Sequence, residues 1–574
     1  MQSKKLRWIL WGSLLASASG CLLVTPLDEL PPATSADGGG AGTAQGGKNQ
    51  AGSTVLPEGG AAGEAASGGG SSGSGGAPIS SLPCTTNAEC VKRASDEPAI
   101  CRQEDHVCVT LKSNECQVAT GDASSPNAIV FGAFATINAA APEENSIIWA
   151  HQLAIDELSG DNLGGLPGGP KKARRPLVMV VCDNSDSDKV DRAVTHLVEE
   201  IRVPAVVATL QPGDLRRAFE DHPNRDVFFI SPVSVTETVA IEDDDNKIWA
   251  LLGQPSDFTP TYAALLSLSE TYVRGLQTVD EREQPLRVAL VTTDDAFDSE
   301  LARAVKPALR FNEKAATENA ENFTIVTIGA KPNFTKIADD LAEWQPDIVV
   351  SAAGVPFLMT NGLQQRLEED WTAFAGSKRP PFYILSPYDA GNLNDLVRRI
   401  NGRLEREPSS NENQRYVGVA IASAPDTSQQ NAYALQLRSK HPNAVVDTAN
   451  YYDAIYYLSY GIFAANQPTG LTGRGIAHGM GRLLTGDTLA IGPDGINEAF
   501  DALAGDTSTL HVVSTLGPPD FDAKTGVRPV DGAVFCFNRP KTSSVLLPDV
   551  LRYDRAKQAL VGKSFPCISG FYTP

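Results

Sequence analysis

Residues 177–209 read LVMVVCDNSDSDKVDRAVTHLVEEIRVPAVVAT and contain the pattern that decides the fold. The run Leu177–Cys182 is continuously apolar, which predicts a strand that is covered on both faces. An acidic, serine-rich segment that can cap a helix follows, and apolar residues then recur at helical spacing at Val190, Ala193, Val194, Leu197 and Val198. A second apolar run, Ala205–Thr209, predicts the next strand. The stretch therefore predicts a parallel strand–helix–strand unit.

Similar units repeat along most of the chain. Further apolar runs that predict strands are Ile129–Phe134, Val227–Ser231, Val288–Thr292, Thr324–Ile328, Ile348–Ala352 and Phe382–Leu385. A second helical stripe follows Asp294 and Asp295, at Phe297, Leu301, Val305 and Leu309. This alternation predicts an α/β fold whose parallel sheets are wound by helices. Because about ten such units are too many for one sheet, we expect two doubly wound domains.

The order of these segments resembles the type 1 periplasmic solute-binding proteins, in the leucine/isoleucine/valine-binding family of ABC transporter substrate-binding proteins. The stretches that carry the resemblance are Ile129–Thr136 (IVFGAFAT), Ile147–Leu158 (IIWAHQLAIDEL), Phe228–Thr238 (FFISPVSVTET), Leu290–Ser299 (LVTTDDAFDS) and Tyr451–Leu458 (YYDAIYYL). The resemblance implies two lobes that are joined by a hinge and close around a small ligand. It implies residues 127–256 and 426–512 for lobe 1, and residues 257–425 and 513–574 for lobe 2.

Five residues are predicted to contact the ligand in the crevice beyond the carboxyl ends of the strands. Lobe 1 contributes Ser234 and Thr236 from the loop that resembles the I-S-P loop of the family, and lobe 2 contributes Phe297, Tyr388 and Asp389. The resemblance also implies lost hydroxyl groups, because Val235 stands where the family has threonine and Phe297 where it has tyrosine. A branched-chain amino acid is therefore not the expected ligand, although an amino-acid-like or related solute is.

Four of these residues also have a structural interpretation. Ser234 and Thr236 are residue types that cap helices, and Phe297 fits a core position equally well. Asp389 precedes Ala-Gly and is typical of a turn.

The N-terminus predicts export. Residues 1–20 combine a basic start with a short apolar core, which is typical of a signal peptide. The ending Ala18-Ser19-Gly20-Cys21 resembles the lipobox of bacterial lipoproteins, in which Cys21 receives the lipid, although Ala18 replaces the usual leucine. An ordinary signal peptide followed by a chance cysteine is the alternative. The residue after Cys21 is Leu22 rather than aspartate, which by the same resemblance favours the outer membrane.

Two further regions precede the α/β segment. Residues 21–83 are rich in glycine and serine and predict a flexible linker. Residues 84–118 form a cysteine-dense module, and the cysteines after Cys21 number eight, which in an exported chain favours disulfides. We expect pairs within the module and a Cys536–Cys567 pair, with Cys116 and Cys182 left to join module and core; the other module cysteines are Cys84, Cys90, Cys101 and Cys108. A zinc site is the less favoured alternative, because the module has no CxxC pair.

Composition and motifs restrict the function. The formal net charge of −21 disfavours nucleic acid as a partner and membrane contact other than through a lipid anchor. The chain has no HExxH, no nucleophile elbow of the G-x-S-x-G type and no complete phosphate loop, so we expect no enzyme activity, no metal and no cofactor. The predicted function is an extracytoplasmic solute-binding lipoprotein for ABC-type uptake, which faces the periplasm or the cell surface and has an ABC permease or a sensor as partner. A degenerate binding fold that acts as a surface recognition or sensory module is the alternative.

Overall fold

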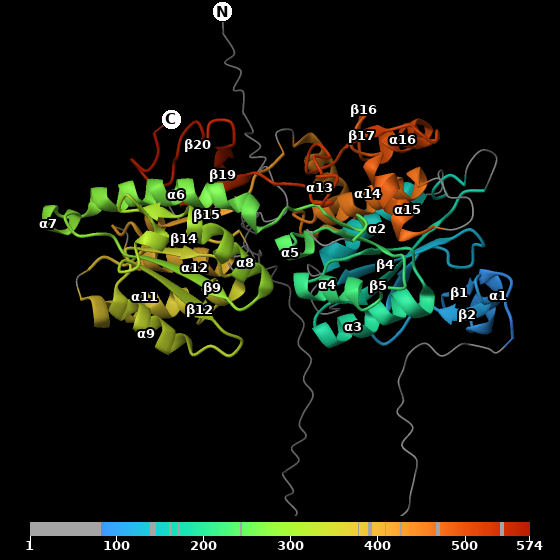
Figure 1. Ribbon diagram of the computed structural model, residues 1–574, viewed down its shortest axis with the longest axis horizontal. Coiled ribbons are helices and arrows are strands. Elements are labelled where there is room, and N and C mark those ends of the chain that lie inside the picture. Colours follow the sequence, from blue (N-terminus) through green and yellow to red (C-terminus); the bar gives the residue numbers. More distant parts are fainter. Residues whose placement is uncertain are drawn as a thin grey trace, which may run out of the picture.

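The computed structural model describes residues 82–137, 145–159, 164–168, 173–240, 244–376, 378–387, 393–407, 409–424, 427–465, 471–539 and 545–573. The predicted signal peptide, Cys21 and nearly all of the predicted linker lie outside these residues. The described chain forms a small cysteine-rich module and two α/β bodies that lie side by side (Figure 1). The α/β fold with two parallel, doubly wound sheets is therefore confirmed.

The cysteine-rich module packs on the outer side of the first body (Figure 1). It consists of helix α1 (Asn87–Arg93) and the antiparallel strands β1 (Ala99–Arg102) and β2 (Val107–Thr110). Thr86 caps the helix by accepting a hydrogen bond from the Glu89 N–H.

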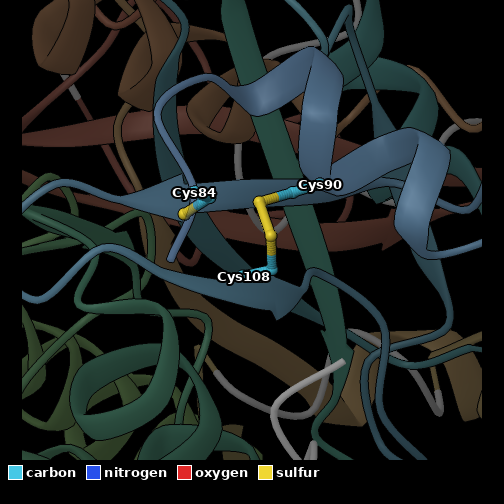
Figure 2. Close-up of side chains that lie close together, drawn as sticks. All are labelled: Cys84, Cys90 and Cys108. Carbon is cyan, nitrogen blue, oxygen red and sulfur yellow. A yellow bond between two sulfur atoms is a disulfide. The ribbon is translucent and has the colours of Figure 1, made fainter. Parts of the chain in front are cut away.

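Four disulfides hold the chain, and they agree with the expectation of pairs within the module, a Cys536–Cys567 pair and a link between Cys116 and Cys182; the sequence left open which cysteines of the module pair with each other. Cys84 pairs with Cys101 and Cys90 with Cys108 inside the module, whereas Cys116–Cys182 joins the module to strand β5, and Cys536–Cys567 lies near the C-terminus. The sulfur atoms of Cys84, Cys90 and Cys108 lie within 4.8 Å of one another, and Figure 2 shows the bond between the last two. These sulfur atoms are bonded in disulfides, which lack the thiolate form that binds zinc.

The first body is built on a six-stranded sheet with the order β3-β5-β4-β6-β7-β8. All neighbouring pairs are parallel except β3–β5. The strands are β3 (Val118–Thr120), β4 (Ile129–Ala135), β5 (Leu177–Asp183), β6 (Ala205–Val207), β7 (Phe228–Ser231) and β8 (Ile248–Ala250). Residues along β4, β6, β7 and β8 are buried at every position, which explains why their sequences are continuously apolar.

Helices cover both faces of this sheet. The predicted stripe after β5 folds as an α-helix that continues into one π-helical turn segment, and its five apolar residues are all buried. Asp186 caps the start of the helix by accepting from the N–H groups of Asp188 and Lys189. The helices of this body are α2 (Ser146–Ser159), α3 (Ser187–Thr195) with the π-helix His196–Ile201, α4 (Pro212–Glu220), α5 (Glu237–Ala240), α13 (Ser428–Lys440), α14 (Ala449–Ala464), α15 (Gly473–Gly481) and α16 (Ile496–Leu503). A small parallel pair, β16 (Asp487–Ala490) and β17 (Leu510–Val513), lies beside them.

The second body has an eight-stranded sheet with the order β12-β9-β13-β14-β15-β18-β19-β20. Its first five strands are parallel and its last three antiparallel. The strands are β9 (Val288–Thr293), β12 (Phe323–Ile328), β13 (Ile348–Ser351), β14 (Phe382–Leu385), β15 (Tyr416–Ile421), β18 (Gly532–Asn538), β19 (Val545–Asp554) and β20 (Ala559–Val561), with a separate hairpin of β10 (Arg310–Phe311) and β11 (Lys314–Ala315).

The helices of the second body form a layer on each side of its sheet. Helix α6 contacts β14, β15 and β18, and the helices α9 and α11 pack against each other in the opposite layer (Figure 1). The helices are α6 (Pro255–Leu276), α7 (Val279–Arg282), α8 (Ala296–Val305), α9 (Phe334–Trp344), α10 (Val355–Leu358), α11 (Leu363–Ala375) and α12 (Leu393–Arg406), with 3-10 turns at Lys306–Ala308, Ala316–Glu318, Glu412–Arg415 and, in the first body, Pro493–Gly495.

The chain passes between the bodies after β8, after β15 and after β17. These crossing segments lie together, because the Ala250 N–H donates to the Gly526 carbonyl and the Ala422 N–H donates to the Asp531 carbonyl. Such adjacent crossings are a suitable place for a hinge. The lobe boundaries expected from the sequence stay a prediction.

Candidate functional site

A cavity of ≈ 960 Å³ lies between the two bodies. The parallel strands have the same spatial order in both sheets, β5-β4-β6-β7-β8 and β12-β9-β13-β14-β15. In each, the strand that comes first in the chain lies between the second and the third, so the direction of the strand order reverses there. Ligands of such open α/β sheets bind beyond the carboxyl ends of the strands, where the order reverses. The cavity occupies this position in both sheets at once, because its walls include residues from the segments that follow β5, β6, β7, β8, β9, β12 and β13.

Both bodies supply the walls. The first body contributes Ile147, Asn184, Thr209, Leu210, Gln211, Pro212, Val233, Ser234, Leu252, Asp447, Thr448, Asn450 and Tyr451. The second body contributes Thr293, Asp294, Asp295, Phe297, Asp298, Ile328, Gly329, Ala330, Pro332, Phe334, Gly354, Val355, Pro356 and Met359. Among these described residues there is no histidine, cysteine, lysine or arginine, so the walls offer apolar contacts, hydroxyl and amide groups and carboxylates.

Two of the predicted site residues line this cavity. Ser234 lies in the wall of the first body and Phe297 in that of the second. Thr236 is not among the lining residues and is buried. Tyr388 and Asp389 lie outside the described residues, so their contact with a ligand stays a prediction.

The loop after β7 shows how its hydroxyl groups are used. The Ser234 hydroxyl donates to the Leu252 carbonyl at 2.7 Å, which ties the loop to the chain beyond β8. The Thr236 hydroxyl accepts from the Val239 N–H at 3.4 Å and thereby caps the short helix α5. The structural interpretation of Thr236 as a helix cap thus agrees with its place in the fold.

Phe297 occupies the first turn of α8, behind a helix cap. The Asp295 carboxylate accepts from the Phe297 N–H at 2.8 Å, which fixes the start of the helix at the cavity wall. The Phe297 ring is nearly buried and packs in the hydrophobic core, while it also lines the cavity. Phe297 therefore belongs both to the hydrophobic core and to the cavity wall.

Two polar atoms of the lining residues are buried without a hydrogen-bond partner in the described part of the chain. They are the Thr209 hydroxyl oxygen and the Asn450 Oδ1, in residues that are only 9% and 2% exposed. The Asn450 Nδ2 donates to the Pro232 carbonyl at 2.8 Å, so its Oδ1 is an acceptor in need of a donor. An unpaired buried polar atom costs about 1–3 kcal/mol, which a ligand or water molecule can offset.

Two aspartates at the cavity have pKa values that burial raises. Asp298 keeps hydrogen bonds from the Thr293 hydroxyl at 2.7 Å and the Gly354 N–H at 3.0 Å, but burial still raises its pKa. Burial raises the pKa of Asp447 to about 6, and no other described residue donates a hydrogen bond to its carboxylate. Asp447 directly precedes the cap of α14.

A carboxylate of the second body also joins the two bodies beside the cavity. Glu300 on α8 accepts from the Glu237 N–H at 2.9 Å and from the Thr238 hydroxyl at 2.5 Å, both of which belong to α5 of the first body. Burial raises the pKa of the Glu237 carboxyl, and the neighbouring Glu300 carboxylate raises it further. We call this set of residues, Glu237, Thr238 and Glu300, the interbody contact.

A buried histidine contacts a residue of the cavity wall. His151 on α2 is fully buried, and neither ring nitrogen has a partner among the described residues. Burial lowers the pKa of His151 to about 3, so the ring is neutral. Its ring meets that of Tyr451, a cavity residue, edge to face at 5.8 Å. His196 in contrast is paired with Glu200 at 2.6 Å.

Sequence reasoning missed the contribution of α14 and the turn before it. Asp447, Thr448 and Asn450 line the cavity next to Tyr451, which begins the stretch Tyr451–Leu458 that carries part of the family resemblance. No spacing in the sequence marks Asp447 or Asn450, because their place depends on how α14 packs across α2.

Comparisons with known proteins give fold-level neighbours only. No protein-family model and no curated protein matches the chain. Similar solved structures include an ABC transporter solute-binding protein from R. palustris in complex with benzoate, with 14% identity, a TM-score of 0.45 and coverage of 76% of this chain and 98% of that chain.

Two further neighbours have names that refer to amino acids. A branched-chain amino acid transporter substrate-binding protein from Streptococcus pneumoniae, in complex with isoleucine, has 14% identity and a TM-score of 0.44, with 73% of this chain and 99% of that chain covered. A leucine-binding protein from Thermotoga maritima has 10% identity and a TM-score of 0.46, with 73% and 97% covered. At these scores the likeness does not extend to function.

Within the described residues, no helix is both long and apolar enough to cross a membrane.

Proposed function

We propose that this protein is an extracytoplasmic binding protein that holds a small solute in the cavity between its two bodies and is not an enzyme. The observation that carries the proposal is the cavity itself, which opens at the carboxyl ends of both sheets and contains buried polar atoms without partners. Its volume of ≈ 960 Å³ fits a small molecule, since such sites usually measure about 300–1,000 Å³.

The proposal also includes a lipid anchor and a transporter that receives the solute. Cys21 carries the lipid that holds the protein at the membrane, residues 21–83 extend the binding bodies away from it, and an ABC permease receives the solute. The alternative, a surface recognition or sensory module, would be favoured by a cavity that apolar side chains fill. The open cavity supports solute binding over recognition of a protein surface.

The test is to identify a solute that the protein retains. Native mass spectrometry of full-length protein from its natural host should detect a small molecule bound with one-to-one stoichiometry. Ala330→Trp should abolish its binding, because Ala330 is an exposed residue of the cavity wall where an indole ring would occupy the space. Ala373→Trp, on an exposed position of α11 away from the cavity, is the matched control.

The proposal would be wrong if no small molecule is retained and none in a broad library raises the melting temperature. A molecule that binds Ala330→Trp as tightly as the parent protein would place the site elsewhere.

A further inference from the structure

The charged groups of the cavity all have the same sign. The ionisable acids among its described lining residues are Asp294, Asp295, Asp298 and Asp447, and no lysine, arginine or histidine lies among them to balance their charge. Low-dielectric walls that carry charge of one sign concentrate ligands of the opposite sign. The cavity therefore favours a cation and disfavours an anion.

Three of these carboxylates are engaged within the second body. Asp294 accepts from the Ala330 N–H at 3.1 Å, Asp295 caps α8, and Asp298 accepts from the loop residues Thr293 and Gly354. Their hydrogen bonds fix the loops that follow β9, β12 and β13. Their charges contribute to the negative potential of the cavity, but their carboxylate oxygens already accept hydrogen bonds within the second body.

Asp447 differs from them in position and in contacts. It belongs to the first body, on the opposite wall, and its carboxylate receives no hydrogen bond from another described residue. A carboxylate that is partly removed from water without a cationic partner is unfavourable. A ligand ammonium group would supply the partner that the described chain does not.

The neighbouring groups suit the same type of ligand. Asn450 presents a buried acceptor, Oδ1, that lacks a donor, and an ammonium group carries only donors. Aromatic rings of Phe297, Phe334 and Tyr451 also line the cavity, and such rings attract cations through their faces. Apolar residues such as Leu210 complete the walls and offer contact to a hydrocarbon body.

We propose that the solute is an organic cation, a protonated amine attached to an apolar body, whose ammonium group pairs with the carboxylate of Asp447. The proposal rests on the proposed function and names its ligand class. The ammonium group donates to Asp447 and Asn450, while the apolar body lies against Phe297 and Phe334 of the opposite wall. A ligand held in this way touches both bodies and stabilises their closed arrangement.

The test uses matched probes on full-length protein. Alkylamines and arylalkylamines of increasing length are each compared with the alcohol and the carboxylate of equal length, by calorimetry and thermal shift. Amines should bind at least tenfold more tightly than either counterpart. Asp447→Asn should weaken amine binding at least tenfold, with the melting temperature of the ligand-free protein unchanged. Asp487→Asn, at an exposed position of β16, should leave binding unchanged.

Three results would each overturn the proposal: no amine binds, a carboxylate or alcohol binds as tightly as its amine, or Asp447→Asn retains full amine affinity. The proposed function is tested separately. A solute of any charge that binds the parent protein but not Ala330→Trp would support solute binding in the cavity, even if it is not an amine. Failure of the amine class and failure of solute binding are thereby distinguished.

Discussion

Removal of the Glu300 carboxylate should separate the two bodies without unfolding either of them. In the interbody contact this side chain is only 8% exposed and accepts hydrogen bonds from the Glu237 N–H and the Thr238 hydroxyl. Glu300→Ala leaves both donors of α5 without their acceptor. When the bodies move apart, water reaches these donors, so the substitution favours the open arrangement.

The size of the effect follows from the contacts. A buried donor left without an acceptor costs about 1–3 kcal/mol, and two such donors set an upper bound of about 6 kcal/mol. Glu237 and Thr238 are half-buried, so water replaces much of what is lost. We therefore expect a net shift toward the open arrangement of about 1–3 kcal/mol, which corresponds to roughly a 5- to 150-fold loss in apparent ligand affinity.

Double electron–electron resonance between two nitroxide labels measures the distance between the two bodies directly. Exposed positions 187 and 331 lie one in each body, close to opposite walls of the cavity, and accept labels without core changes. Glu300→Ala should lengthen the label distance and broaden its distribution. The melting temperature should change little, because both sheets and their cores stay intact.

The isostere Glu237→Gln is the matched control. It replaces the titratable carboxyl, which shares a side-chain hydrogen bond with Glu300, by a neutral amide, and it keeps the backbone N–H that donates to the Glu300 carboxylate. In the parent protein the pKa of Glu237 is raised above 4.5, so the contact is strongest at low pH and weakens as the pH rises through the raised pKa. Glu237→Gln should remove this weakening. Identical label distances in the parent protein and Glu300→Ala would refute the role of the interbody contact.

Three further predictions concern stability, pH and anchoring. Glu368→Ala should lower the free energy of unfolding by about 1–3 kcal/mol in urea titration, because it removes the carboxylate whose two oxygens accept from the buried Arg415 guanidinium at 2.9 and 2.7 Å, while Glu412 still accepts from that guanidinium; Glu369→Ala, at a more exposed carboxylate, should change it by less than about 0.5 kcal/mol, and equal losses would contradict the argument. Amine affinity should be constant between about pH 7 and pH 9, where the amine keeps its proton, and should fall about tenfold per pH unit below the Asp447 pKa of about 6, because a proton then competes with the ammonium group; a flat calorimetric profile in the parent protein, or an unchanged fall in Asp447→Asn, would count against that pairing. Cys21→Ala should move the protein from the membrane fraction to the soluble fraction; sedimentation with membranes despite normal processing would show that Cys21 is not the anchor.

The secondary structure of the sheets was predictable because burial on both faces leaves a direct mark on the sequence. Each predicted strand exists, and Phe382–Leu385 has the predicted bounds. Ala205–Thr209 ends two residues early, at Val207, because Thr209 has left the sheet and lines the cavity. The periodic stripe after β5 is equally well predicted, although its second half is a π-helix rather than an α-helix.

The antiparallel extension of the second sheet was not predicted. Strands β18, β19 and β20 follow β17 across a long connection, and β18 pairs with β15, which precedes it by more than a hundred residues. Pairing over such a distance depends on the finished parallel sheet, which presents β15 as an edge. Only Cys536, in β18, and its partner Cys567 indicated from the sequence that this segment is tied down.

The cavity could be located from sequence more readily than it could be described chemically. Strand ends fix where a crevice forms, and two of the residues that this reasoning selected, Ser234 and Phe297, line the cavity, whereas their contact with a ligand stays a prediction. The character of the crevice depends on α14, which reaches it only after the chain has crossed to the second body and returned. There Asp447 lines the same cavity as the loops after β9 and β12, from which it is more than a hundred residues distant in the chain. A carboxylate without a described partner, in a cavity whose described lining residues include aromatic rings and no basic side chain, is a property of that assembly. No local pattern in the sequence encodes this combination of residues. A comparison of amine and carboxylate ligands therefore tests whether these distant residues together form a site for a cation.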